Sequence, residues 1–196
     1  EGTTVHSIIP DMIEAGTFLI AAAATGGDVT VKNIIPKHLE SLTAKLIEMN
    51  VNVVEGDDWI RVCGGNKLQK VNIKTLPYPG FATDLHPQAT VLLCLADGCS
   101  TISEGIWPQR FQYVNELKKM GAKIRVDSNV AVVEGPCTLT GARVNAIDLR
   151  AGAAVVIAGL AAKGTTVVDN VKYIDRGYED FVGKLQRIGA DIQRIK

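Results

Sequence analysis

The sequence has no excess of charge of either sign, because 21 Lys and Arg residues balance 21 Asp and Glu residues. Such a chain has no global field that would attract nucleic acid or an acidic membrane surface, so we expect neither partner. Aromatic residues are also few, at 5% of the chain, and offer little surface on which bases could stack. These shortages argue against a nucleic-acid-binding module.

Cysteine and histidine are scarce and scattered. The four cysteines contain no CxxC motif, and no His/Cys pair stands at the spacing of zinc ligands. None of the three histidines has a nearby serine, cysteine or acid that would suggest a nucleophilic triad. The sequence therefore predicts no metal, no cofactor and no disulfide framework, and it favours a cytoplasmic protein with reduced core thiols.

Long hydrophobic runs are absent as well. The most apolar stretches, at 14–24, 89–96 and 151–162, are about a dozen residues or fewer. A membrane-spanning helix needs about 20 apolar residues, so these stretches are expected in a protein core. At 196 residues, the chain is long enough to bury such a core in a single domain.

One pattern of predicted elements occurs three times along the chain. An apolar helix is followed by a glycine and a short strand, and 71 residues separate Gly27 from Gly98 while 66 separate Gly98 from Gly164. An amphipathic helix follows each copy. We predict three β-α-β-α-β-β units at about 1–63, 71–134 and 138–196.

Two strands at the ends of the chain belong to this prediction. The first unit is expected to open with a strand at 3–9, and the third is expected to end with a strand at 191–195. The third unit then lacks its last strand. An unpaired sheet edge of this kind is usually covered or completed by another segment.

The fold class predicted is α+β, with three buried helices at the centre. If an approximate threefold axis relates these helices, their amino termini share one end, where unpaired N–H groups favour anions. Polar residues fall at this end: Asp11, Glu14, Thr83, Asp84, Asp148 and Arg150. Helix capping would explain most of them equally well, and Asp148 is the expected structural partner of Arg150.

Four motifs carry a family resemblance. The segments 6–18, 79–84, 147–150 and 174–178 together resemble the UDP-N-acetylglucosamine enolpyruvyl transferases of bacterial cell-wall synthesis. The resemblance covers only the carboxy-terminal half of such an enzyme. It implies an inside-out barrel domain, built from three repeats around buried parallel helices, with substrates held in the cleft between two such domains.

The resemblance also implies roles for individual residues. Asp84 matches the carboxylate that binds the sugar and serves as candidate base, and Arg176 matches the arginine that holds phosphoenolpyruvate. Ile106 matches the position whose backbone contacts the nucleotide sugar. The remaining matches are Asp148 and Arg150 at the reaction centre, Asp11 at the domain interface and Arg110 in the cleft. A structural alternative for Arg176 is a loop ion pair with Asp175.

The sequence departs from the family pattern at three places. Met12 replaces a common arginine, Ala82 replaces a proline, and the loop 105–109 differs at several positions. The reactive cysteine loop and the lysine-asparagine pair of the family belong to its amino-terminal half. We therefore expect this chain alone to be inactive and its partners to be that half, UDP-N-acetylglucosamine and phosphoenolpyruvate.

Two other functions remain open at this point. The nearer is the sister enzyme that acts on shikimate 3-phosphate, which shares the fold. The other is a non-catalytic ligand- or RNA-binding module of the same architecture. The amino-acid sequence of the segments 6–18 and 174–178 favours the cell-wall enzyme.

Overall fold

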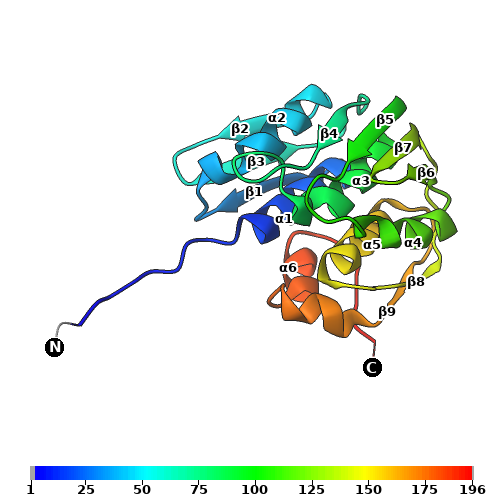
Figure 1. Ribbon diagram of the computed structural model, residues 1–196. Helices are drawn as coiled ribbons and strands as arrows, with labels where there is room; N and C mark the ends of the chain where they lie inside the picture. Colours follow the sequence, from blue (N-terminus) through cyan, green and yellow to red (C-terminus); the bar gives the residue numbers. More distant parts are fainter. Residues whose placement is uncertain (1–2, 196) are drawn as a thin grey trace.

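A computed structural model describes residues 3–195 and contains nine strands in three sheets within that range (Figure 1). The first sheet has the order β1-β3-β2 and is antiparallel. The second has the order β4-β5-β7-β6, with β4 and β5 parallel, and the third is the parallel pair β8-β9. The strands are β1 (Asp28–Lys32), β2 (Asn52–Glu55), β3 (Trp59–Cys63), β4 (Asn72–Lys74), β5 (Gly98–Ser103), β6 (Lys123–Asp127), β7 (Val130–Gly135), β8 (Arg143–Asn145) and β9 (Val167–Asp169).

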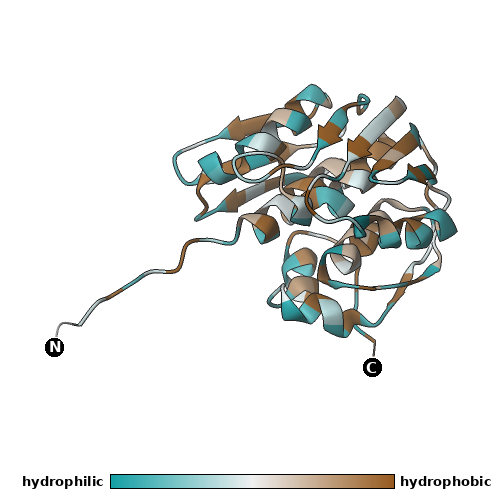
Figure 2. Cartoon of the chain, viewed as in Figure 1, coloured by the Kyte–Doolittle hydropathy of each residue, from teal (hydrophilic) through white to brown (hydrophobic). Residues whose placement is uncertain are grey.

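Helices of two kinds accompany the sheets. Three are apolar: α1 (Met12–Thr25), α3 (His86–Leu95) and α5 (Leu149–Ala161). Three are amphipathic: α2 (Glu40–Glu48), α4 (Val114–Lys119) and α6 (Phe181–Arg187). Short 3-10 turns are η1 (Pro36–Leu39), η2 (Thr83–Leu85), η3 (Arg110–Tyr113) and η4 (Val171–Arg176). Figure 2 shows hydrophilic residues on the outer helices α2, α4 and α6.

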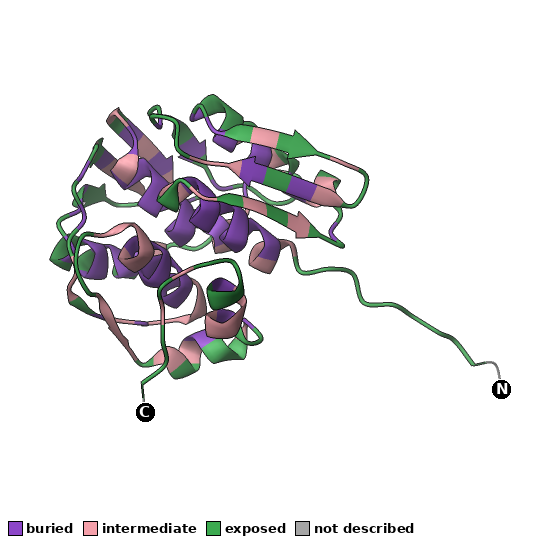
Figure 3. Ribbon diagram, turned by 180° about the vertical axis from the view of Figure 1, so that it is seen from behind, coloured by how far each residue is buried: buried purple, intermediate pink, exposed green. Residues whose placement is uncertain are grey.

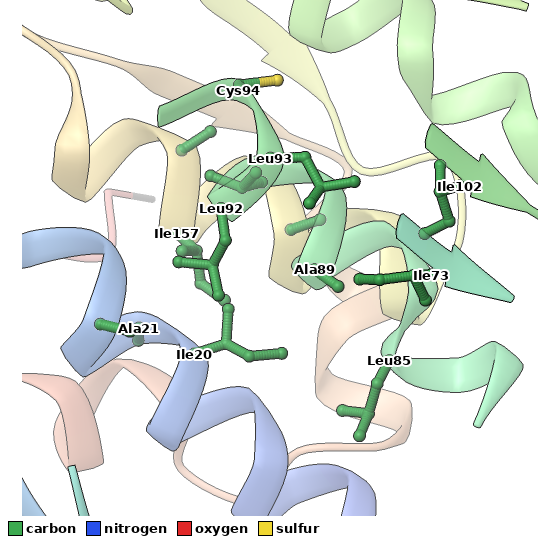
Figure 4. Packing of buried hydrophobic residues seen from close by; sticks show 14 of the residues in the cluster. Ile20, Ala21, Ile73, Leu85, Ala89, Leu92, Leu93, Cys94, Ile102 and Ile157 are labelled. Carbon is green, nitrogen blue, oxygen red and sulfur yellow. The ribbon is translucent and has the colours of Figure 1, made fainter. Parts of the chain in front are cut away.

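The three apolar helices contact one another at the centre of the molecule. Most residues of these helices are buried, whichever side of the helix they lie on, as Figure 3 shows. This is expected because none of the three helices has a polar face. Leu92 of α3 lies close to Ile20 of α1 and Ile157 of α5 in the core (Figure 4). The predicted α+β class and the buried helices are therefore confirmed.

Small residues set how closely these helices approach their neighbours. A side chain at Gly152 would put its Cβ 2.9 Å from the Cβ of Ala146, and it would also press against Ile174 of η4. A Cβ at Gly16 would lie 2.9 Å from two methyl groups of Leu85. Glycine at these positions lets η4 and η2 lie directly against α5 and α1.

Some sequence-based expectations about the sheets are wrong. Residues 3–9 form no strand but an exposed extended arm, in which the side chains of Val5 and Ile8 are more than 90% exposed (Figure 1). Residues 191–195 also belong to no strand. Both segments contain β-branched apolar residues, but neither finds a neighbouring strand to complete its hydrogen bonds. Within residues 3–195 the three sheets stay separate, and no closed barrel forms.

No helix within the described part of the chain combines the length and hydropathy that crossing a bilayer requires. The longest, α1, has 14 residues.

Candidate functional site

The centre of the candidate site is the carboxylate of Asp84, on η2 at the start of α3. Its Oδ1 accepts a hydrogen bond from Nη2 of Arg110 at 2.8 Å, and its Oδ2 accepts one from Nε of Arg150 at 3.2 Å. The two arginine side chains are only 13% exposed, whereas that of Asp84 is 40% exposed. The fold thus brings together three predicted site residues from the second and third predicted units.

Asp84 does not cap a helix. Neither η2 nor α3 has a side-chain hydrogen bond at its amino terminus, and the carboxylate faces the two guanidinium groups instead. The capping alternative is therefore wrong for Asp84. A partly exposed carboxylate between two cations is free to meet a ligand.

Asp11 and Asp148 do cap helices, as the alternative predicted. Oδ1 of Asp11 accepts from the backbone N–H of Ile13 at 2.7 Å, and Oδ1 of Asp148 accepts from that of Ala151 at 2.7 Å. Among the described residues, Oδ2 of Asp148 has no hydrogen-bond partner, so one oxygen of this half-buried carboxylate is available.

Arg150 pairs with a residue distant in sequence. Its expected partner Asp148 receives only its backbone N–H, while its guanidinium reaches Asp84 and lies 5.4 Å above the ring of Tyr178. That expectation is wrong because the cap holds Oδ1 of Asp148 against the backbone N–H groups of Arg150 and Ala151, while the guanidinium extends to Asp84. Burial lowers the pKa of Arg150, but Tyr178 and Asp84 outweigh this effect and raise it, so the charge is fixed.

Arg110 and Arg150 each have a buried side-chain nitrogen that makes no hydrogen bond among the described residues. Nη1 of Arg150 and Nε of Arg110 are buried without a hydrogen-bond partner in the described part of the chain. A buried guanidinium donor without a partner is costly, and an anionic ligand would satisfy it.

Tyr178 connects the loop that carries Arg176 to the buried helices. Its hydroxyl lies 3.0 Å from Oγ1 of Thr17 on α1, and it accepts from Nε2 of Gln88 on α3 at 3.2 Å. This fully buried contact places η4 beside the amino ends of the helices. Arg176, at the end of η4, is nevertheless exposed.

Arg176 has no ion pair among residues 3–195. Its expected structural partner Asp175 is held instead by Arg194, at 2.7 Å and 3.0 Å. The structural alternative for Arg176 is therefore wrong. The structure does not bring Arg176 into contact with Asp84, and it remains a separate exposed cation.

Ile106 lies in the loop after β5, and its side chain is 40% exposed. Its backbone N–H donates to the carboxylate of Glu104 at 2.7 Å and is therefore not free to bind a ligand. Its carbonyl oxygen has no partner within the described residues. A backbone contact from Ile106 to a nucleotide sugar would use this carbonyl.

Glu104 is a site residue that sequence reasoning missed. It is 2% exposed and accepts hydrogen bonds from Thr75, Thr83, Ile106 and Trp107. Burial raises the pKa of this carboxyl group, but the four hydrogen bonds outweigh it and hold the pKa below its usual value. The position of an acidic residue directly after the strand β5 was the sequence feature that could have indicated its role.

The carboxylate at the centre of the site is open to solvent, because its side chain is 40% exposed. Two surface hollows, of about 510 and 390 Å³, lie elsewhere, beside α6 and beside η3. Neither is lined by Asp84, Arg110 or Arg150. A ligand bound at Asp84 would therefore need a second surface to enclose it.

Comparisons with known proteins identify the family of this chain. The model of the family described as EPSP synthase (3-phosphoshikimate 1-carboxyvinyltransferase) matches residues 1–185. The chain belongs to this family. This confirms the enolpyruvyl-transferase-like fold expected from the resemblance.

Several curated relatives carry the more specific name expected. UDP-N-acetylglucosamine 1-carboxyvinyltransferase 3 of Caldanaerobacter subterraneus is 60% identical over 97% of this chain and 46% of its own length. UDP-N-acetylglucosamine 1-carboxyvinyltransferase 2 of Clostridium acetobutylicum is 53% identical with the same coverage. The chain thus spans about half the length of the curated relatives it matches.

Solved structures show the same architecture. The enolpyruvyl transferase NikO from Streptomyces tendae has a TM-score of 0.86 and 32% identity, over 95% of this chain and 44% of that one. An EPSP synthase from Acinetobacter baumannii has a TM-score of 0.75 at 18% identity, covering 96% of this chain and 48% of that one, which supports the fold alone.

The departures from the enolpyruvyl transferase pattern are accommodated locally. Ala82 has φ −66°, the value that a proline would impose, so the backbone before Thr83 needs no proline to adopt this course. Met12 packs partly buried against the core. A Cβ at Gly105 would lie 2.8 Å from the carbonyl oxygen of Thr75, so glycine lets this loop lie against β4.

A fully buried histidine beside the site should make the stability of this enolpyruvyl transferase domain depend on pH. Burial lowers the pKa of His86 to about 4, although Glu104, 3.3 Å away, opposes the shift. Between pH 6.5 and 4 the unfolded chain takes up this proton and the folded chain does not, so stability falls as the pH falls. We expect a loss of about 2 kcal/mol between pH 7 and pH 5.

Urea unfolding at pH 7 and pH 5 measures this loss. His86→Phe keeps an aromatic ring beside Phe111 and Tyr113 and removes the titrating group. Its free energy of unfolding should therefore change much less over the same interval. An equal loss in the two proteins would show that His86 is not responsible.

Proposed function

We propose that this chain is the carboxy-terminal domain of a UDP-N-acetylglucosamine enolpyruvyl transferase. The whole enzyme would transfer the enolpyruvyl group of phosphoenolpyruvate to the 3-hydroxyl of the sugar and release phosphate. The observation that carries the proposal is the Asp84 carboxylate, which is held by Arg110 and Arg150 at the amino ends of buried helices. The names of relatives at 50–60% identity support the choice of substrates.

Asp84 would act as the base. Its exposed carboxylate could accept the proton of the sugar 3-hydroxyl, and the 3.2 Å contact to Arg150 is the longer of its two hydrogen bonds and the easier to exchange. The sugar oxygen then bonds to C2 of phosphoenolpyruvate, and the bond from C2 to the phosphate oxygen breaks. The two arginines keep the carboxylate oriented throughout.

The anionic substrate would be held by guanidinium groups. Arg176 is exposed and without an ion pair in the described chain, so its charge is available to phosphoenolpyruvate. The buried nitrogens of Arg110 and Arg150 that make no hydrogen bond among the described residues would bind the same substrate nearer Asp84. The free oxygen of Asp148 would face the reaction centre, and Asp11 would face the other domain.

The rest of the enzyme would supply the second wall of the site. We propose that it carries the reactive cysteine loop and closes over the exposed carboxylate of Asp84. The three units at about 1–63, 71–134 and 138–196 would form one of the two similar domains. Following the sequence resemblance, we also propose that the enzyme serves peptidoglycan synthesis in the cytoplasm, with no nucleic-acid or membrane partner.

The sister activity on shikimate 3-phosphate is the second candidate, and the description of the matching family favours it. Saturation-transfer NMR on this chain with each acceptor separates the two. We expect signal transfer to UDP-N-acetylglucosamine and none to shikimate 3-phosphate. Binding of shikimate 3-phosphate alone would reverse the assignment, and salt-dependent retention of RNA on a filter would favour the RNA-binding alternative instead.

A further inference from the structure

Glu104 accepts hydrogen bonds from three segments beside the candidate site. Its Oε1 accepts from Oγ1 of Thr75 at 2.7 Å and from the backbone N–H groups of Ile106 at 2.7 Å and Trp107 at 3.0 Å. Its Oε2 accepts from Oγ1 of Thr83 at 2.8 Å. One buried carboxylate therefore joins β4, η2 and the loop after β5.

The segments joined in this way carry the two groups assigned to the nucleotide sugar. Thr83 directly precedes the proposed base, Asp84, and Ile106 is the proposed backbone contact. We propose that Glu104 is a positioning residue that fixes the distance between the Asp84 carboxylate and the Ile106 carbonyl, and so sets the affinity for the nucleotide sugar. This inference rests on the proposed function.

Glu104 cannot itself touch a substrate in this structure. Its side chain is 0% exposed, and both oxygens are already engaged as acceptors. Its backbone is held as well, because its N–H donates to the carbonyl of Asn129 at 2.7 Å and its carbonyl accepts from the Asn129 side chain at 3.1 Å. A carboxylate fixed on all sides acts through the groups that it holds.

The hydrogen-bond pattern predicts opposite results for two substitutions. In Glu104→Gln, the amide oxygen can replace Oε1 and still accept from Ile106 and Trp107, while the Thr83 hydroxyl can turn and accept from the amide nitrogen. In Glu104→Ala, two backbone N–H groups and two hydroxyls lose their acceptor. The loop and η2 would then be free to shift relative to each other.

The activity test uses a full-length chimera, in which this chain replaces the matching 46% of the Caldanaerobacter relative. Glu104→Ala should raise KM for UDP-N-acetylglucosamine at least tenfold and lower kcat about a hundredfold. A displacement of the Asp84 carboxylate by about 1 Å is enough for a loss of that size in kcat. KM for phosphoenolpyruvate should stay within about twofold, and Glu104→Gln should stay within about fivefold of the parent in kcat and both KM values.

Amide hydrogen exchange on this chain measures how firmly Glu104 holds the loop, and it requires no enzyme activity. The N–H groups of Ile106 and Trp107 should exchange at least about tenfold faster in Glu104→Ala than in Glu104→Gln. Thr43→Val, which removes a buried hydroxyl whose hydrogen bond goes to the Glu40 carbonyl within α2, should leave both rates unchanged. If Glu104→Ala does not fold, Thr83→Val removes one tie and should raise KM for the nucleotide sugar alone.

The possible failures are distinguishable. An active parent chimera in which Glu104→Ala or Thr83→Val changes both KM values equally, or neither, would overturn the positioning role and leave the proposed function standing. Unchanged exchange at Ile106 and Trp107 in Glu104→Ala would overturn it as well. An inactive parent chimera would instead contradict the proposed function, and the positioning role with it.

Discussion

Asp84→Asn should slow the chimera about a hundredfold or more in kcat, because an amide cannot take up the proton of the sugar hydroxyl. The substitution should cost little stability. The side chain is 40% exposed, and the amide oxygen can still accept from Arg110, so the free energy of unfolding should fall by no more than about 1 kcal/mol. Steady-state phosphate release and urea unfolding of the same sample measure both quantities.

A matched control is available on β1. Asp28 is also a partly exposed carboxylate, and it forms two hydrogen bonds with a single arginine, Arg61, at 2.6 and 2.8 Å. Asp28→Asn should leave kcat unchanged. An Asp84→Asn enzyme as fast as the parent would show that the carboxylate is only a structural partner of the arginines.

Arg176→Met should raise KM for phosphoenolpyruvate by roughly 10- to 100-fold, because a charge-assisted contact to the anionic substrate is lost. The free energy of unfolding should change by less than about 0.5 kcal/mol, since Arg176 is exposed and makes no ion pair within residues 3–195. Initial rates at varied phosphoenolpyruvate, with the nucleotide sugar saturating, measure the change.

Lys172→Met is the control for this substitution. Lys172 is an exposed cation on the same 3-10 turn, four residues earlier, and its Nζ lies over the ring of Tyr173. Its removal should leave KM for phosphoenolpyruvate within about twofold. Equal effects of the two substitutions would mean that the general positive charge of η4 is felt, and not a specific contact of Arg176.

Much of the site could be predicted from the sequence because its residues stand at the starts of repeated helices. Asp84 and Arg150 are 66 residues apart, yet their helices begin at the same end of the molecule, so the two side chains meet. The pairing itself was not predictable. Asp148 is the nearer carboxylate in sequence, but its role as a helix cap leaves Arg150 to reach Asp84.

The remaining errors also have physical causes. A short segment with β-branched residues, as at 3–9 and 191–195, forms a strand only where a neighbouring strand is present, and a sequence does not show its neighbours. Glu104 was overlooked because a lone acid in a loop is usually solvated, whereas here four donors from three segments enclose it. That enclosure exists only in the folded chain.

Phosphate release tests the central claim most directly, that this domain supplies one wall of an active site divided between two domains. With its side chain 40% exposed, Asp84 is not shielded from water by this chain alone, and chemistry on two substrates needs a site that closes. Supplied with phosphoenolpyruvate and UDP-N-acetylglucosamine, the chain alone should release no phosphate above a heat-killed control, and the chimera should release it in proportion to the enolpyruvyl product. Phosphate release by the chain alone would contradict the divided site, and a folded chimera that releases none with this acceptor would contradict the assigned activity.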